Sequence, residues 1–401
     1  MYHDESLLTH VQSSLLGYHE AKGEINRVIS SDYNNISHYI RFDELLQKLA
    51  DKSVSYEGKK DSLRAFLNTK NIYLWYYHNF HNSAGIPRLG KPLEEVLPFN
   101  NKEYTPHIKA YLRWLEQLPD HVFTNRNLAL SDNAVGNEEI LLDSLINELQ
   151  SDQTQLGFKK AIKAFHRTNR SLKKYVNDLL EYKANLLLIR LDIGFNKIYL
   201  DQSRNSLEDD LLKSLAKVDP KDITDNTPNF KDQYVEALNT QLEADLKSIK
   251  AYRAKFFRSL KSKYAIEGFI WKLEFGADKS FHYHCLFLLN GDKHREDISI
   301  AKDMGEMWKQ LTVNEDGETT KGIYWNCNAH KEKYKYLAIG HLHANDTDMK
   351  NNLFKYVLTY LAKTDYYIKL ARTNDRTIGM GNDKEKIKSG RPRKAKVQKI
   401  S

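Results

Sequence analysis

The chain has 401 residues, a length that corresponds to two or three domains. Hydrophobic residues make up 41% and charged residues 28%, so the chain can bury a sizeable core and does not have the composition of a disordered protein. Lysine and arginine exceed aspartate and glutamate by 61 to 53, and this net charge of +8 favours a polyanionic partner. The two cysteines, Cys285 and Cys327, provide neither a disulfide framework nor a four-cysteine zinc site.

The sequence predicts no targeting or membrane segment. Its first ten residues lack the basic and apolar regions of a secretory signal. No apolar run approaches the roughly 20 residues that a membrane helix needs. We therefore expect a cytoplasmic protein with no membrane partner.

The first 150 residues are expected to be mostly helical, because their apolar residues recur at three- and four-residue spacing. The predicted segments are Ile36–Leu49, Asn71–Phe80, Tyr111–Leu118 and Glu138–Leu149. A polar stretch follows at residues 150–157. We therefore assign residues 1–157 to a helical N-terminal domain. The sequence leaves open whether this domain binds an origin or a partner.

From residue 158 onward the pattern becomes mixed. Phe158–Tyr182 reads as a long basic helix, and the mostly apolar Asn185–Gly194 is typical of a buried central strand. After the polar residues 201–231, the pattern predicts a helix, a hairpin of two strands, a helix, two strands and a helix. In order, these are Tyr234–Ser262, Gly268–Phe275, Phe281–Leu289, Ile298–Leu311, Gly322–Cys327, Tyr336–Leu342 and Asp346–Lys363. Residues 158–380 are therefore expected to form an α+β domain, an α/β sandwich with an antiparallel sheet flanked by helices.

A basic tail is expected at residues 381–401. Arg391, Arg393 and Lys394 in this tail are candidate DNA-binding residues. An Arg-Pro-Arg segment can enter an A·T-rich minor groove. Basic tails more often bind polyanions without sequence preference, and a non-specific tether is the interpretation we adopt.

The hairpin carries the first chemical signal, the histidine pair His282 and His284. Residues two apart on a strand face the same side, so this pair presents two imidazoles together. Neutral imidazoles on a rigid strand suit a divalent metal. Glu274 lies across the hairpin turn, where it can supply the third ligand and leave metal positions open for a substrate oxygen. The alternative to a metal site is that one histidine of the pair packs in the core and the other is hydrogen-bonded.

Three further residues are possible neighbours of this site. His341 and His343 form a rival pair, but no strand with a carboxylate directly precedes them. Asp192 on the predicted central strand is either a fourth polar group of the site or a buried aspartate that pairs with Arg190 or with a backbone amide.

The last predicted helix carries the second signal. Tyr356 and Tyr360 are four residues apart and are expected to share one helix face, and Lys363 follows one turn later. A tyrosine oxygen can attack a phosphodiester when a metal positions the phosphate, and a nearby lysine can stabilise the phosphate or assist proton transfer. Packing in the core is the alternative role, and it is the stronger alternative for Tyr356.

Together these residues resemble the HUH family of single-strand DNA nickases, which includes rolling-circle replication initiators, relaxases and some transposases. Tyr360-Leu-Ala-Lys363 is similar to the single-tyrosine motif of that family. The longer Tyr356-x-x-x-Tyr360-x-x-Lys363 is similar to the two-tyrosine motif of phage initiators. Tyr283, between the two histidines, departs from the usual aliphatic residue.

A closer resemblance covers about residues 185–395. The segments that carry it are Ile189–Phe195, Ile270–Gly276, Tyr324–Asn328, Tyr360–Tyr367 and Arg376–Gly379. They are similar to the inovirus gene-2-protein type of replication protein, the YagK/YfjJ C-terminal domain proteins of prophages and integrated elements. In that family the tyrosine to expect is the one at Tyr360.

This resemblance implies a replication initiator that nicks single-stranded DNA at an origin. His282, His284 and Glu274 would hold Mg²⁺ or Mn²⁺, and attack by Tyr360 would leave a 5′-phosphotyrosine and a free 3′-OH. If Tyr356 also reaches the site, it would allow successive cleavages. The sequence has no Walker-type phosphate-binding motif, so a host helicase is the expected partner. An HUH transposase or relaxase and a catalytically inactive DNA-binding regulator of a prophage are the alternatives.

Overall fold

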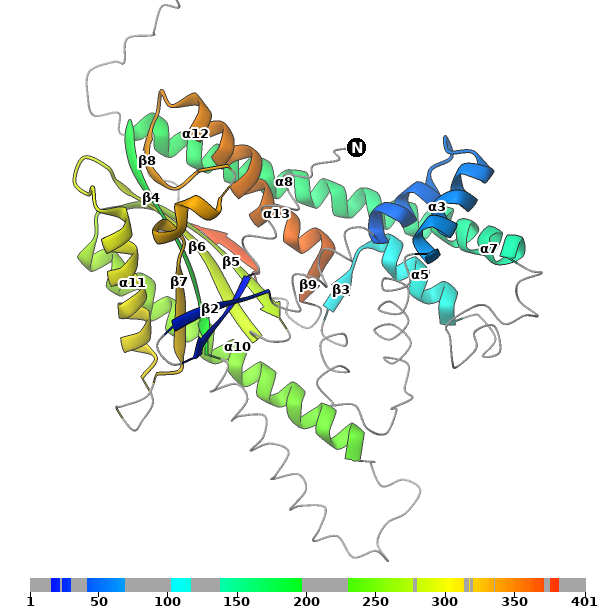
Figure 1. The fold of residues 1–401 in the computed structure, drawn as a ribbon, viewed down its shortest axis with the longest axis horizontal. Helices are drawn as coiled ribbons and strands as arrows, with labels where there is room; N and C mark the ends of the chain where they lie inside the picture. Colours follow the sequence, from blue (N-terminus) through cyan, green and yellow to red (C-terminus); the bar gives the residue numbers. More distant parts are fainter. Residues whose placement is uncertain are drawn as a thin grey trace, which may run out of the picture.

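A computed structural model of the chain describes residues 16–21, 24–29, 42–68, 102–116, 138–196, 230–276, 280–313, 317, 320–334, 336–370 and 376–381. The chain forms helices around an open antiparallel sheet of six strands (Figure 1). This confirms the predicted α+β class with a helix-flanked antiparallel sheet. None of the helices in the described ranges is long and apolar enough to cross a membrane.

The sheet runs in the order β10–β5–β6–β4–β7. β8 also pairs with β4, at the end of β4 that β7 does not cover. The strand bounds are β4 Asn185–Phe195, β5 Ile266–Gly276, β6 Ser280–Asn290, β7 Gly322–Asn326, β8 Gly340–His343 and β10 Ile378–Met380. All pairings are antiparallel. The strand that carries His282 and His284 is β6, which lies between β5 and β4.

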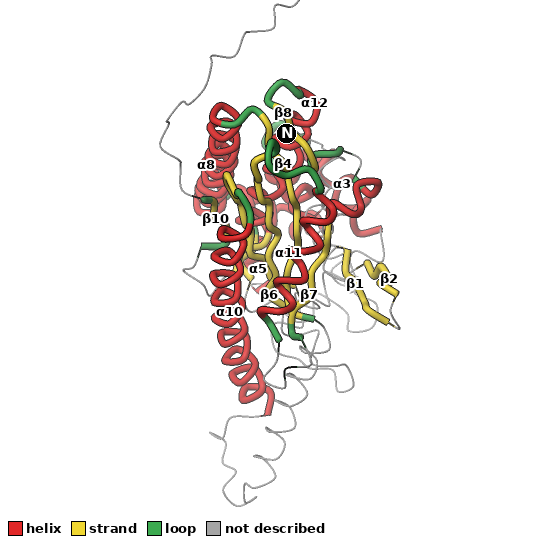
Figure 2. Tube along the Cα trace, turned by 90° about the vertical axis from the view of Figure 1, so that its left-hand side faces the viewer, coloured by secondary structure: helices red, strands yellow, loops and turns green. Residues whose placement is uncertain are grey.

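The two faces of the sheet bury separate sets of apolar side chains, because β4 and β6 carry apolar side chains on both faces. The odd-numbered residues of β4 pack under α10 (Phe230–Lys263) and α11 (Asp297–Leu311). Leu186 and Leu188 pack on the opposite face, under α8 (Asp152–Tyr182) and α13 (Leu358–Tyr367). The sheet therefore lies between two helical layers, and α10 extends past its end in both views (Figures 1 and 2).

The long helix α8 joins this sheet to helices from the first part of the chain (Figure 1). It packs on α5 (Pro106–Glu116) and α7 (Glu138–Gln150), and farther along on α13. Arg113 on α5 donates to Glu148 on α7 and to Thr154 on α8, which ties the three helices together. The helical segment 42–50 and α3 (Tyr56–Asn68) complete the described helices before α7.

The first residue of α8 is set by Ser151. Its hydroxyl accepts a hydrogen bond from the backbone N–H of Thr154 at 3.3 Å, which satisfies one of the unpaired donors at the helix start. The helix therefore begins at Asp152, and the boundary expected after residue 157 falls inside it.

The structure adds strands that the sequence pattern did not predict. β1 (Leu16–Ala21) pairs with β2 (Glu24–Ile29), and β3 (Lys102–Tyr104) pairs with β9 (Ile368–Leu370). The three-residue strands β3, β9 and β10 are too short to show alternation. The strand predicted at Tyr336–Leu342 is shorter in the structure, where it is β8. The predicted helix at residues 71–80 lies outside the described residues.

The predicted helix over 346–363 is three consecutive segments in the structure. They are α12 (Thr347–Asn352), a π-helical turn η6 (Leu353–Val357) and α13. The Thr359 hydroxyl donates to the carbonyl of Phe354, five residues earlier, at 3.0 Å. The wider turn changes which side chains share a face before the chain reaches Tyr360.

Candidate active site

The register of three neighbouring strands gathers polar side chains on one face of the sheet. His284 on β6 lies opposite Asp192 on β4 and opposite Lys272 on β5. One step along, His282 lies opposite Glu274 on β5 and opposite Gly194 on β4. Directly opposed residues of antiparallel strands point to the same side. These residues therefore share the face that packs under α8 and α13.

His284 lies between two carboxylates. Its Nδ1 is 2.7 Å from Oδ1 of Asp192, and its Nε2 is 3.3 Å from Oε2 of Glu274. The Nε2 of His282 is 3.9 Å from the same oxygen of Glu274. One ligand atom from each of Glu274, His282 and His284 lies within 4.8 Å of the others. Two imidazoles and one carboxylate at this spacing fit a single divalent cation.

Asp192 acts on this cluster through His284. Its carboxylate faces Nδ1, so it favours the tautomer with a proton on Nδ1 and directs the lone pair of Nε2 toward Glu274 and His282. A carboxylate on the far side of a ligating histidine is a common arrangement in metal sites. Asp192 lies next to the histidine pair and its charge also acts on Arg190, so the two roles expected for it are not exclusive.

Burial and charge together set the protonation of the cluster. Burial alone would lower the pKa of His284, but the Asp192 and Glu274 carboxylates raise it to about 9. Burial works against ionisation of Glu274, yet His284, His282 and Lys272 hold its pKa well below its usual range. Without a cation, the cluster therefore favours an ionised Glu274 and a protonated His284. A cation would compete with that proton for Nε2.

Tyr360 reaches the cluster from α13. Its hydroxyl lies 3.4 Å from each carboxylate oxygen of Glu274, and its ring centroid is 6.0 Å from that of His284. The side chain is 1% exposed. Burial, together with the neighbouring Glu274 carboxylate, raises the pKa of Tyr360 well above its usual range. The phenol is therefore held neutral, with its hydroxyl directed at Glu274.

Tyr356 lies elsewhere. Its ring stacks on Tyr336 with centroids 3.9 Å apart, and no contact between Tyr356 and Glu274, His282 or His284 occurs in the described part of the chain. The expectation that both tyrosines share one face assumed an α-helix. Tyr356 belongs to the π-helical turn η6, where four residues fall short of a full turn.

The other expected residues lie apart from the cluster or outside the described residues. His341 and His343 on β8 pair with Leu187 and Asn185, so they are on the opposite face of the sheet from His282. The backbone of Lys363 belongs to α13, but its side chain is outside the description. Arg391, Arg393 and Lys394 also lie outside the described residues.

The structure buries two cations next to the cluster. The sequence interpretation missed Lys272 and named Arg190 only as a possible partner of Asp192. Lys272 is 1% exposed and lies directly across from His284, and Arg190 is 3% exposed and precedes Asp192 by two residues. The Arg190 guanidinium lies 5.7 Å from the centre of the Tyr334 ring. The alternation of a strand is the signal that could have found them, because each lies two residues from a carboxylate of the cluster.

The part of the chain that carries this cluster matches a known protein family. The family model for the YagK/YfjJ C-terminal domain matches residues 152–381, which is more than half of the chain. The chain belongs to the YagK/YfjJ C-terminal domain family. The region of the YagK/YfjJ match starts at the first residue of α8 and ends just after β10, so it includes the whole polar cluster. No curated protein and no solved structure matches the chain.

Proposed function

We propose that this YagK/YfjJ domain protein is a metal-dependent nickase of the HUH type, which cuts single-stranded DNA to start rolling-circle replication of a phage or an integrated element. The observation that supports this most is the position of Tyr360. Its hydroxyl lies 3.4 Å from Glu274, beside the two histidines of β6. A nucleophile next to a three-ligand cation site is the arrangement that phosphodiester transfer needs.

The residues of the chain divide the work. His282, His284 and Glu274 would hold Mg²⁺ or Mn²⁺, and Asp192 would orient His284. When bound, the cation supplies Lewis-acid polarisation of the scissile phosphate. The Tyr360 oxygen forms a bond to phosphorus as the bond to the 3′ oxygen breaks. The phenolic proton passes to solvent, and the leaving 3′ oxygen takes up a proton from solvent, which gives a 5′-phosphotyrosine and a free 3′-OH.

A second candidate function is a DNA-binding regulator that keeps the fold without the chemistry. The observation that favours it is the burial of Tyr360, which is 1% exposed. A DNA phosphate can reach the hydroxyl only if a covering segment moves. A polar cluster that is buried in this way can instead have a purely structural role, in which it holds the strands in register.

A covalent-adduct assay separates the two functions. The protein is incubated with Mn²⁺ and single-stranded DNA from the intergenic region of its own locus, and an SDS-resistant complex is sought. We expect a complex that is lost in EDTA and in Tyr360→Phe, because that change removes only the attacking oxygen. Tyr356→Phe is the matched control and should retain the complex, since Tyr356 stacks on Tyr336.

Two results would contradict the proposal. Loss of the complex in Tyr356→Phe, but not in Tyr360→Phe, would assign the chemistry to the other tyrosine. DNA binding without any complex on either strand would support the regulator.

A further inference from the structure

A pair of stacked rings lies one strand away from the candidate active site. The rings of Trp325 and His330 have centroids 4.0 Å apart and planes inclined by 4°. Trp325 is on β7, and His330 is on the short helix η5 (Cys327–Lys333) that follows it. The Asn326 side chain accepts a hydrogen bond from the N–H of Ala329 and caps η5. The turn from β7 into η5 therefore returns His330 over Trp325.

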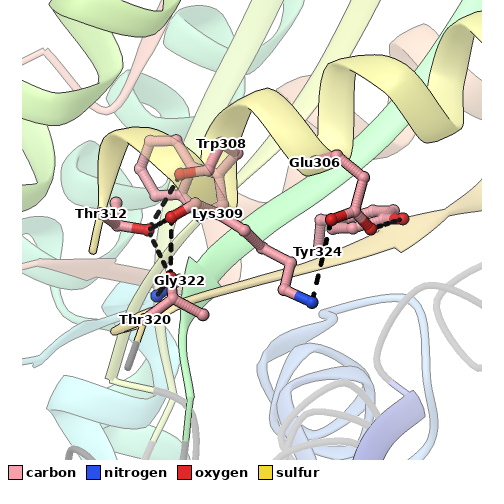
Figure 3. A network of polar contacts seen from close by, with 7 residues as sticks. All are labelled: Glu306, Trp308, Lys309, Thr312, Thr320, Gly322 and Tyr324. Carbon is pink, nitrogen blue, oxygen red and sulfur yellow. Dashed lines mark hydrogen bonds and ion pairs between the residues drawn. The ribbon is translucent and has the colours of Figure 1, made fainter. Parts of the chain in front are cut away.

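The strand register shows that this stack is on the site face. Trp325 lies directly opposite Asp192, which contacts His284. The neighbouring side chain, Tyr324, points the other way and donates to Glu306 on α11 at 2.9 Å (Figure 3). Successive residues of a strand alternate in direction, so Trp325 faces away from α11. One row across the sheet thus holds the stack, Asp192 and His284.

The two rings differ in exposure. Trp325 is 7% exposed, whereas about a third of the His330 side chain (32%) is exposed. Lys333 Nζ lies 4.8 Å from the centre of the Trp325 ring. The neighbouring Lys331 forms an ion pair with Asp297, with 2.6 Å between Nζ and Oδ2. The stack therefore has a covered Trp325 ring, a partly open His330 ring and the Lys333 ammonium group over the Trp325 ring.

We propose that the Trp325–His330 stack is a platform for one base of the single-stranded DNA that enters the candidate active site, with Lys333 facing the adjacent phosphate. This inference rests on the proposed function, since it assigns the path of the same strand. An aromatic surface beside a cation is how proteins hold single strands without reading sequence, because every base has a π face. The bases of a duplex are already stacked on one another, so the platform selects single strands.

Binding of a fluorescein-labelled oligothymidylate tests the platform. All variants carry Tyr360→Phe, so that a covalent step does not contribute, and affinity is read from fluorescence anisotropy in Mg²⁺. We expect His330→Ala to weaken binding about 5- to 150-fold, the equivalent of one lost base–aromatic stack. His330→Phe should retain affinity, because it keeps the ring. Binding of duplex DNA should change little in either variant.

His343→Ala is the matched control, because this histidine is also exposed but lies on the opposite face of the sheet. An affinity for His330→Ala equal to that of His343→Ala would overturn the platform. An equal loss of duplex binding would also overturn it, in favour of general attraction to DNA.

The adduct assay keeps this test separate from that of the nickase. If no adduct forms but His330→Ala still loses single-strand affinity, the platform stands and the nickase fails. If the adduct forms and His330→Ala binds normally, the nickase stands and the platform fails.

Discussion

At the residue scale, the contact between Asp192 and His284 explains why the cluster suits a cation. The carboxylate is 2.7 Å from Nδ1, so the imidazole is fixed in orientation and Nε2 is made more basic. The side chain opposite His282 on β4 is absent, since that position is Gly194. A Cβ there would lie 3.1 Å from the Cβ of His282, so the glycine leaves room for the ring to turn toward Glu274.

Asp192→Asn tests this role directly. The change keeps the shape of the side chain and removes its charge, and it allows the amide to donate to Nδ1 and select the wrong tautomer. We expect affinity for Mn²⁺ to fall about 10- to 100-fold, as is typical when the partner of a ligating histidine is lost. Calorimetric titration with Mn²⁺ measures the effect.

Asp303→Asn is the control for Asp192→Asn. Asp303 pairs with Lys263 on the surface, away from the cluster, and its loss should leave Mn²⁺ affinity unchanged. Wild-type affinity in Asp192→Asn would show that Asp192 does not support a metal ligand.

At the element scale, β7 is held in place from behind by α11. The Tyr324 hydroxyl donates to Glu306, and Thr312, at the end of α11, lies within hydrogen-bond distance of Thr320 just before β7 (Figure 3). Gly305 lets the helix approach, because a Cβ at this position would overlap the Tyr324 ring. The close approach fixes the edge strand that carries Trp325.

Gly305→Ala should therefore destabilise the protein by roughly 1–3 kcal/mol, the usual cost of overpacking a core. The steric effect has to outweigh the gain of about 1 kcal/mol in helix propensity from Gly to Ala. Thermal unfolding measures it. Gly157→Ala in α8 is the control, since its Cβ would make only a tight contact, at 3.3 Å, with Pro106. Equal melting temperatures for the two variants would show that α11 can move away from β7.

How far the sequence could predict these elements depends on what fixes each one. The hairpin register was accessible, because a short connection between two alternating strands determines which residues oppose each other, and Glu274 does pair with His282. The pairing of Asp192 with His284 could not be predicted in this way, because β4 and β6 are far apart in the sequence and no turn sets their register. The π-helical turn that separates Tyr356 from Tyr360 leaves no mark in apolar spacing.

At the scale of the whole molecule, His284 links stability to pH. The Asp192 and Glu274 carboxylates outweigh the effect of burial and raise its pKa from the ordinary 6.5 to about 9. The folded state therefore binds this proton more tightly than the unfolded state. The stability that it contributes is fully present below about pH 6.5 and is lost as the pH rises toward 9. Glu274, with its pKa held well below its usual range, stays ionised throughout this window.

Two opposite pH dependences follow from this linkage. In EDTA, the melting temperature should fall between pH 6.5 and 9 as the His284 proton is lost. In Mn²⁺ the cation replaces that proton, so the increase in melting temperature caused by the metal should grow over the same range. Thermal unfolding with and without Mn²⁺ at several pH values measures both. His343→Gln should behave as wild type, because that histidine is outside the cluster. His284→Gln should lose both dependences, and a Mn²⁺ effect that persists in it would place the cation elsewhere.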